Sequence, residues 1–201
     1  MTSRLTRIPA AVAALLAALF TALLLASCSS PAPDSHSNHP NSDQPVVTGQ
    51  PAGFNADDVS FATDMIPHHQ QAVEMSQLVP DRTTNQQLIA LANQISSAQQ
   101  PEINALRVFL VQWNENPQDS TGGHQEHGAM TGMVDEATMT KLQSLKGADF
   151  DKLWLQSMIN HHQGAIEMAK AEVANGQNVD AKNMAQNIIE TQQAEIGTMK
   201  Q

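Results

Sequence analysis

Apolar side chains recur every three or four residues along four long segments of the chain, which is the spacing of one face of an α-helix. The predicted bounds are about 57–79, closed by Pro80-Asp81; a second segment beginning near Asp81; 149–174, closed by Asn175-Gly176; and a fourth segment beginning near Asn178. A shorter helix is predicted over 135–145, ending at Gly147. Four long helices in two hairpins, with a short extra helix between them, predict an all-α four-helix bundle.

The two predicted hairpins are copies of each other. Residues 58–75 align with residues 151–168 at an offset of 93 without a gap, and both blocks contain Met-x-x-His-His. At the same offset, Gln99-Gln100-x-Glu102-Ile103 matches Gln192-Gln193-x-Glu195-Ile196 in the second helix of each hairpin. Self-similarity of this kind indicates duplication of one structural unit. The predicted organisation of the domain over 54–201 is a first repeat over 54–115, a linker over 116–134, the short helix over 135–147 and a second repeat over 148–201.

Two prolines interrupt the symmetry of the repeats. Pro67 and Pro101 lie inside predicted helices, where proline removes a backbone hydrogen bond and kinks the axis. Their counterparts in the second repeat are Asn160 and Ala194. Any kink is therefore not shared by the two halves.

The first 53 residues predict an export signal followed by a tether. Arg4 and Arg7 precede an uncharged apolar run over 10–26 that is short for a membrane span, so a cleaved signal peptide over 1–27 is expected. The quartet Leu25-Ala26-Ser27-Cys28 is similar to a bacterial lipobox, in which the cysteine is lipidated. Residues 28–53 have the polar, proline-containing composition of a disordered tether. We therefore expect a lipoprotein anchored through Cys28 to the extracytoplasmic face of the cell membrane.

Composition narrows the range of partners. The chain has 10 Lys+Arg against 20 Asp+Glu, and removal of Arg4 and Arg7 with the signal changes the net charge from −10 to −12. This acidity argues against nucleic acid and anionic lipid surfaces as partners and favours cations. Cys28 is the only cysteine, so its lipidation excludes a disulfide, a thiolate metal site and a cysteine nucleophile. Methionine and histidine are prominent instead, with 10 and 8 residues.

Both histidine pairs are predicted to face the core of the bundle. A helical projection puts His68 and His69 on the apolar arc of their helix, and the second repeat copies this with His161 and His162. In each second helix the same projection aims one glutamine and one glutamate at the core. These are Gln99, Glu102, Gln192 and Glu195. Because a buried charge or unpaired polar group is costly unless compensated, these side chains are expected to find one another or a cation.

Two interpretations of this polar core stay open. In the first, histidines and glutamates hydrogen-bond across the bundle and fix the helix register without a metal. In the second, which we favour, the core binds metal, because imidazole and thioether together suit copper-type ions. The candidate core ligands are Met65, His68, His69, Met75, Met158, His161, His162 and Met168. Glu102 and Glu195 are either further ligands or acceptors that orient the imidazole rings.

The linker contains a second candidate site, His124-x-x-His127-x-x-Met130-x-x-Met133. Thioethers select Cu(I), and imidazole accepts either copper oxidation state. In a Gly-rich, exposed segment Met130 and Met133 have no core to fill, which favours copper binding by this array and fast exchange there. Zinc is less favoured without thiolates or a closed tetrahedral set, and calcium or magnesium would require oxygen ligands.

The two Met-x-x-His-His blocks, the Gln-x-x-Glu-Ile elements and the His/Met linker together resemble the bacterial "domain of unknown function 305" family. The resemblance covers about 54–201. It implies a ferritin-like four-helix bundle, secretion or lipid anchoring and, in some members, copper binding and copper tolerance. Carried over by position, the family's signature falls on the eight Met and His residues of the two blocks. One departure is Leu106, at the position where the second repeat has Met199.

Three classes of function follow from these features. The first is a non-catalytic lipoprotein that binds metal, with copper as Cu(I) or Cu(II) the expected ion, for sequestration or tolerance. The second is a di-iron-type oxidase on a ferritin-like bundle; against it, the chain lacks the Glu-x-x-His pairs of that site. The third is a metal-free envelope interaction module whose histidines sense pH. A homo-oligomer is compatible with all three.

Overall fold

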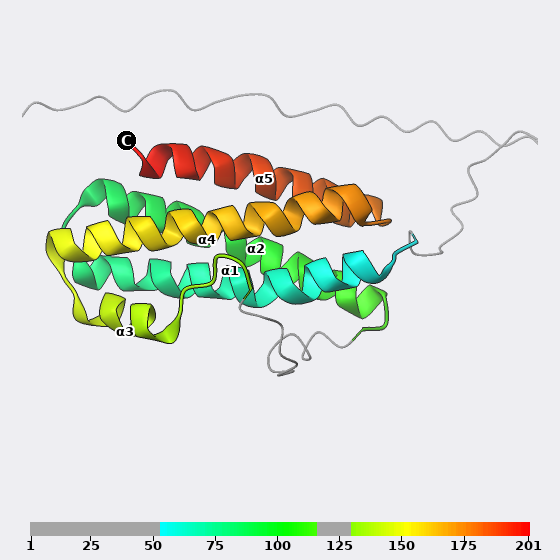
Figure 1. The fold of residues 1–201 in the computed structure, drawn as a ribbon, viewed down its shortest axis with the longest axis horizontal. Coiled ribbons are helices and arrows are strands. Elements are labelled where there is room, and N and C mark those ends of the chain that lie inside the picture. Colours follow the sequence, from blue (N-terminus) through cyan, green and yellow to red (C-terminus); the bar gives the residue numbers. More distant parts are fainter. Residues whose placement is uncertain (1–52, 116–129) are drawn as a thin grey trace, which may run out of the picture. The chain divides into compact units, whose positions relative to one another are not determined.

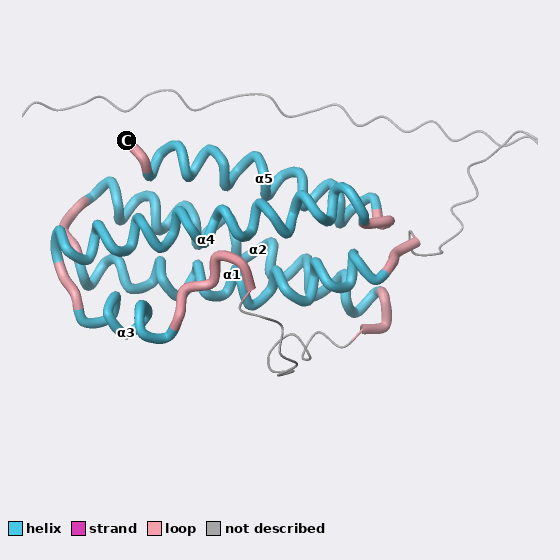
Figure 2. The backbone as a smooth tube through the Cα atoms, viewed as in Figure 1, coloured by secondary structure: helices cyan, strands magenta, loops and turns pink. Residues whose placement is uncertain are grey.

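The computed structural model describes residues 53–115 and 130–201, and every regular element in these ranges is an α-helix. The helices are α1 (Ala56–Arg82), α2 (Gln86–Gln112), α3 (Glu136–Ser144), α4 (Gly147–Asn175) and α5 (Val179–Met199). The four long helices lie side by side as a bundle, and the short α3 packs against α1 and α4 (Figures 1 and 2). The predicted all-α bundle of two hairpins with a short helix between them is confirmed.

Several predicted features lie outside the described residues. They are the export signal over 1–27, the lipobox residue Cys28, the tether up to residue 52, and the linker over 116–129 with His124 and His127. Within 53–115 and 130–201, none of the helices combines the length and the apolar character that a membrane crossing requires.

Asparagine side chains cap the starts of α1, α2 and α5, whereas α4 has no side-chain cap. Asn85 accepts hydrogen bonds from the backbone N–H groups of Gln87 and Leu88, and Asn178, its counterpart 93 residues later, caps α5 in the same way. The predicted start of α2 near Asp81 is therefore wrong by about one turn. The predicted end of α1 at Pro80 is also wrong: α1 continues through Pro80 to Arg82. Proline removes its own N–H donor and crowds the carbonyl four residues earlier, but the helix still closes beyond it: the Thr83 N–H donates to the Val79 carbonyl at 3.2 Å.

The two hairpins clamp each other at both ends. Asp58, near the start of α1, accepts the backbone N–H of Asn178 at 2.9 Å, at the beginning of α5. At the other end, the Asn85 amide lies 3.4 Å from the carboxylate of Asp151, near the start of α4. Asp58 and Asp151 are repeat counterparts, as are Asn85 and Asn178. Helices α1 and α4 therefore run antiparallel, and the duplicated sequence folds with approximate twofold symmetry.

The bundle has two apolar clusters rather than one continuous core. One cluster, at the end where residue 53 joins, is built around Phe61, Ile66, Leu110, Trp113 and Ile188. The other, at the α3 end, is built around Leu88, Ile95, Phe150 and Trp154. Along each long helix, the residues that change from one cluster to the other flank the inward His, Gln or Glu positions. A polar layer therefore crosses the middle of the bundle and separates the clusters.

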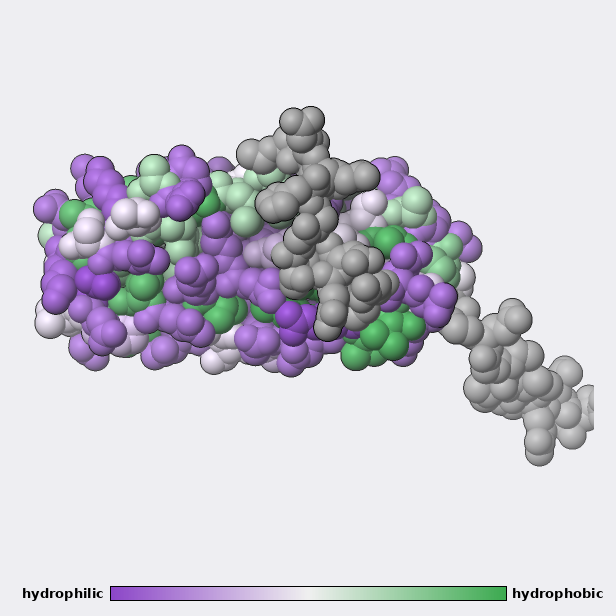
Figure 3. Space-filling view, turned by 90° about the horizontal axis from the view of Figure 1, so that it is seen from below, coloured by the Kyte–Doolittle hydropathy of each residue, from purple (hydrophilic) through white to green (hydrophobic). Residues whose placement is uncertain are grey.

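The outer surface is mostly hydrophilic, as Figure 3 shows for one face. Among the described residues, the large hydrophobic side chains that are exposed are Phe54, Val108, Val111 and Val179. They belong to the start of α1, the end of α2 and the start of α5. These segments meet at one end of the bundle, and the opposite end has none of the four.

A buried carboxyl pair lies at that same end. Glu172 of α4 is 1% exposed, and burial together with the neighbouring Asp58 carboxylate raises the pKa of Glu172 to about 8, against the opposing effect of Lys182. Burial also raises the pKa of Asp58, but hydrogen bonds from the backbone N–H groups of Asn55, Asn178 and Gln177 outweigh it and hold that pKa below its ordinary value. At neutral pH a pKa of about 8 keeps Glu172 protonated beside the Asp58 carboxylate.

This pair predicts a pH dependence of stability. Because the folded protein holds the Glu172 proton more tightly than the unfolded chain, whose ordinary pKa is 4.5, protonated Glu172 contributes stability that is complete below pH 4.5 and is lost as the pH rises to about 8. Glu172→Gln should flatten the decline of the unfolding free energy between pH 5 and pH 9, roughly the window these pKa values set. Denaturant titrations at each pH measure it. An unchanged slope in the variant would show that Glu172 is ionised in the folded state.

Candidate metal centre

Four histidines form the centre of the polar layer. His68 and His69 lie on α1, His161 and His162 lie on α4, and all four are 0% exposed. Consecutive residues on a helix point about 100° apart, so each pair spreads across the inward face of its helix. The predicted burial of all four imidazoles is confirmed. Glu74, on the opposite side of α1, and its counterpart Glu167 are exposed, as the projection predicts.

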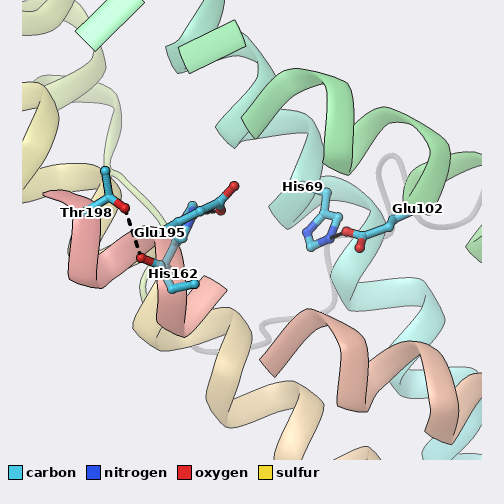
Figure 4. Close-up of polar contacts among 6 residues, drawn as sticks. His69, Glu102, His162, Glu195 and Thr198 are labelled. Atoms are coloured by element: carbon cyan, nitrogen blue, oxygen red, sulfur yellow. Dashed lines mark hydrogen bonds and ion pairs between the residues drawn. The ribbon is translucent and has the colours of Figure 1, made fainter. Parts of the chain in front are cut away.

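Two histidines bind glutamates of the neighbouring helix in the same hairpin. His69 Nε2 lies 2.8 Å from Glu102 Oε2, and His162 Nε2 lies 2.8 Å from Glu195 Oε2. Figure 4 shows the two pairs, each joining the first helix of a hairpin to the second. A carboxylate only accepts, so the histidine donates through Nε2–H. In the tautomer that carries its proton on Nε2, the other nitrogen, Nδ1, is the acceptor. Among the described residues neither Nδ1 atom has a hydrogen-bond partner.

The other two histidines meet each other across the centre of the bundle. The ring centroids of His68 and His161 are 3.8 Å apart, with an angle of 36° between the planes. His68 Nε2 lies 3.3 Å from the backbone carbonyl of Thr131, which fixes the proton on Nε2 because a carbonyl only accepts. His68 Nδ1 and both nitrogens of His161 have no hydrogen-bond partner in the described part of the chain.

The central pair is held in the neutral state. Burial, reinforced by the nearby His69, lowers the pKa of His68 from 6.5 to about 3. Burial and the surrounding imidazoles lower the pKa of His161 well below 6.5 as well. Desolvation disfavours the charged ring, so lone pairs stay available on the central imidazoles at neutral pH.

Amide groups add further unpaired donors and acceptors to the layer. Gln99 of α2 and its counterpart Gln192 of α5 are 2% and 3% exposed. Neither polar atom of the Gln99 amide, nor Gln192 Oε1, nor Glu195 Oε1 has a partner among the described residues. Buried polar atoms in folded proteins are nearly always hydrogen-bonded, and exceptions call for an explanation such as an ion or a water molecule.

The methionines of the two repeats lie in the apolar clusters on either side of the polar layer. Met65, Met75 and Met158 are 0% exposed, whereas Met168 is partly buried. Met65 and Met158 are repeat counterparts and belong to opposite apolar clusters, as antiparallel packing of α1 and α4 requires. Each stands one helical turn before His68 or His161, so a thioether lies on the same helical face as each central imidazole. At the asymmetric position, Leu106 and Met199 are both buried.

The expectation of an exposed linker array needs correction for its second half. Met130 and Met133 are half-buried, because the linker segment that carries them is fastened to α1 and α4. Thr131 and Gln71, which make these contacts, were not singled out by sequence reasoning. A clue was available: Gln71 and its counterpart Gly164 differ although most flanking positions match. His124 and His127 lie outside the described residues.

The donor set suits some metals better than others. No group of three or more His, Cys, Asp or Glu side chains within the described ranges is arranged to hold a metal. A zinc site, with four such ligands in a tetrahedron, is therefore not preformed. Neutral imidazoles beside thioethers instead match a soft ion, because thioether ligands select Cu(I) and imidazole also suits copper. Glu102 and Glu195 are already bonded to His69 and His162, so they fit the role of orienting the rings.

Comparison with known proteins places this geometry in context. The family model described as Domain of unknown function (DUF305) matches residues 58–201. A DUF305 protein from Streptomyces coelicolor, described as secreted, is 36% identical with a TM-score of 0.65, over 71% of this chain and 89% of that one. A DUF305 fragment from Deinococcus radiodurans is 28% identical with a TM-score of 0.67, over 75% of this chain and 96% of that one.

A third solved structure is a protein studied with bound metal. CopM in the Cu(II)-bound form is 32% identical, with a TM-score of 0.62, over 71% of this chain and 93% of that one. CopM is also known in Cu(I)-bound and Ag-bound forms. Among curated proteins, the uncharacterized protein L153 of Acanthamoeba polyphaga mimivirus is 39% identical over 54 residues. That match spans 27% of this chain and 36% of the length of the viral protein.

The two His–Glu bonds offer a matched stability test. Replacing Glu195 with the apolar Met leaves buried His162 Nε2–H without an acceptor, which should lower the unfolding free energy of the metal-free protein by about 1–3 kcal/mol. Glu102→Met should cost less, because the Glu102 side chain is 21% exposed against 3% for Glu195, so water can replace it. Glu195→Gln, which keeps an acceptor, is the control. Equal losses in the two Met variants would contradict the role of water access, and no loss in Glu195→Met would contradict the assigned bond.

Proposed function

The chain belongs to the family described as Domain of unknown function (DUF305), and on this premise we propose that it is a copper-binding protein that holds the ion in the polar layer of its helical bundle. The proposed role is sequestration of copper outside the cytoplasm, which gives tolerance to the metal. The protein is proposed to act as an exported lipoprotein anchored through Cys28, with the domain carried on the tether over 28–53. Binding is the whole of this role, and no catalytic step is needed.

One observation carries the proposal: the middle of the bundle contains many buried polar atoms that have no hydrogen-bond partner among the described residues. They include Nδ1 of His68, His69 and His162, and both ring nitrogens of His161. Leaving a buried polar atom unpaired costs about 1–3 kcal/mol, so the layer lowers the stability of the metal-free protein. A bound cation would give several of these imidazole nitrogens a ligand bond.

The ligand chemistry supports copper. Three of the four imidazoles have Nε2 engaged with a carboxylate or carbonyl oxygen, which orients the ring and leaves Nδ1 as the free ligand atom. Metal-binding histidines characteristically donate their other N–H to such an acceptor. The buried thioethers of Met65 and Met158 lie one turn from the central histidines and add the softness that favours Cu(I). The Cu(I), Cu(II) and Ag forms of CopM, a relative with the same fold, agree with this choice.

The alternatives receive less support from the same residues. A di-iron oxidase site needs several carboxylates from four helices, whereas the described polar layer contributes Glu102 and Glu195, each bonded to a histidine. A pH-sensing module needs histidines that become charged near neutral pH. Burial holds the pKa of His68 at about 3 and that of His161 well below 6.5, so the central pair stays neutral across that range.

A Cu(I) competition titration of the full chain with a coloured chelator tests the proposal. His68→Ala with His161→Ala should weaken Cu(I) binding by more than the roughly 10–100-fold that loss of a ring-orienting partner costs, because these are direct ligands. Met130→Leu with Met133→Leu should weaken binding while the helices stay folded, as thermal melts would show. The control is His36→Ala with His39→Ala, in the predicted tether, which should bind like wild type. Wild-type affinity in the core variant would overturn the proposed site.

A further inference from the structure

A short segment before α3 crosses the bundle directly over the central histidines. We call residues Met130, Thr131, Gly132, Met133 and Val134 the strap. Figures 1 and 2 show it as a loop that passes over α4 and α1 near their midpoints before the chain enters α3. A hydrogen bond from Met133 N–H to the Met130 carbonyl, at 3.0 Å, closes a turn within it.

The strap is fastened to α1 by side-chain hydrogen bonds. The Gln71 amide donates to the Val134 carbonyl and accepts the Val134 N–H, both at 2.8 Å. His68 Nε2 donates to the Thr131 carbonyl at 3.3 Å. Three bonds therefore tie the strap to α1, and one of them ends on a member of the central histidine pair.

On α4 the strap fits because Gly164 has no side chain. A Cβ atom on Gly164 would lie 1.9 Å from the Thr131 carbonyl oxygen and 2.9 Å from Gly132 Cα. Gly132 itself has a φ of +87°, and a Cβ there would lie 2.7 Å from the Asn160 carbonyl oxygen. Both contacts are with backbone atoms, which cannot swing away as a flexible side chain can. Any larger residue at position 164 must push the strap off α4.

Gln71 and Gly164 are counterparts in the duplicated sequence, 93 residues apart. They lie on opposite sides of the approximate twofold axis, three residues after His68 and His161. A single strap crossing that axis meets both positions, and it needs a bonding partner on one side and empty space on the other. The mismatch between Gln71 and Gly164 therefore coincides with an element that breaks the twofold symmetry.

From this geometry we propose that Gln71 and Gly164 are positioning residues that hold the strap over His68 and His161, and that the strap controls how fast a soft cation reaches or leaves the pair. The strap also makes the two histidines different. His68 gives its Nε2–H to Thr131, whereas both nitrogens of His161 are unpaired within the described residues. His161 is thus the imidazole better able to take a ligand first.

The strap places thioethers on the path to the pair. Met130 and Met133 flank the residues that touch His68 and Gly164, and both are half-buried rather than solvated. A soft ion that moves between solvent and the central imidazoles on this side of the bundle would meet these two methionines. The covering of the histidines does not depend on any metal, whereas the control of cation exchange rests on the proposed copper function.

The first arm of the test uses the metal-free full chain. Diethyl pyrocarbonate acylates accessible neutral imidazoles, and peptide mass mapping reports the rate at each histidine. In Gln71→Ala, His68 and His161 should react roughly tenfold faster than in wild type, since losing two hydrogen bonds raises the population of the open strap by that order. Gly164→Ala should raise the same two rates, because the added Cβ displaces the Thr131 carbonyl. His69 and His162, bonded to glutamates away from the strap, are internal references and should keep their rates.

Matched controls are available for both changes. Gly197 is another helical glycine, and a Cβ added there would meet nothing within 4 Å, so Gly197→Ala tests for a general effect of alanine. Gln163, beside Gly164 on α4, is exposed, so Gln163→Ala controls for loss of a glutamine side chain. In both control variants His68 and His161 should react at wild-type rates. If Gly164→Ala fails to fold, Gln71→Ala alone still decides the outcome.

The second arm measures transfer of Cu(I) from the loaded full chain to an excess of chelator. The strap variants should release Cu(I) roughly tenfold faster, with a smaller change in equilibrium affinity. The reason is that opening the strap raises the rate of exchange but leaves the bonds between Cu(I) and its ligands in place. Unchanged acylation rates at His68 and His161 in a folded Gln71→Ala protein would overturn the proposal. Faster acylation with wild-type release of Cu(I) would overturn control of exchange. Failure of wild-type protein to bind Cu(I) would count against the copper function alone.

Discussion

The burial of four imidazoles between two apolar clusters is the constraint on which the rest of the structure depends. All four rings are shielded from bulk solvent, so most of their hydrogen-bond partners must come from the protein. Glu102 and Glu195 satisfy one nitrogen each of His69 and His162, and the Thr131 carbonyl satisfies one of His68. The nitrogens left over share one level of the bundle. A fold that only needed stability would be better served by apolar side chains here, which is why the layer points to ligand binding.

Duplication explains how such a layer can be built from a short sequence pattern. One Met-x-x-His-His helix followed by one Gln-x-x-Glu helix supplies half of the layer, and antiparallel docking of α1 on α4 supplies the other half. The clamps at Asp58 and Asp151 hold the two halves in register. The strap then crosses the twofold axis once, so the two halves differ where it lies. The symmetric part of the molecule thus positions the donors, and the asymmetric part distinguishes His68 from His161.

Much of this arrangement could be predicted from the sequence, since helical periodicity determines which side chains face inward. The bundle, the duplication, and the burial of the four histidines, Gln99, Gln192 and Glu195 follow from spacing alone. Periodicity does not report contacts between helices, so it could not show that each glutamate bonds the second histidine of its pair. It also could not show that Met130 and Met133 are held against the bundle, because that depends on Gln71 and on the space above Gly164. The error at Pro80 arose because one proline removes one backbone hydrogen bond and does not by itself end a helix.

Anomalous diffraction at the copper absorption edge, from crystals of the Cu(I)-loaded protein, would locate copper in the proposed polar-layer site. An anomalous peak is expected at the centre of the bundle, beside His161 and bounded by imidazole Nδ1 atoms and thioether sulfur. A peak confined to the outer surface, with the histidine layer arranged as in the metal-free protein, would contradict it.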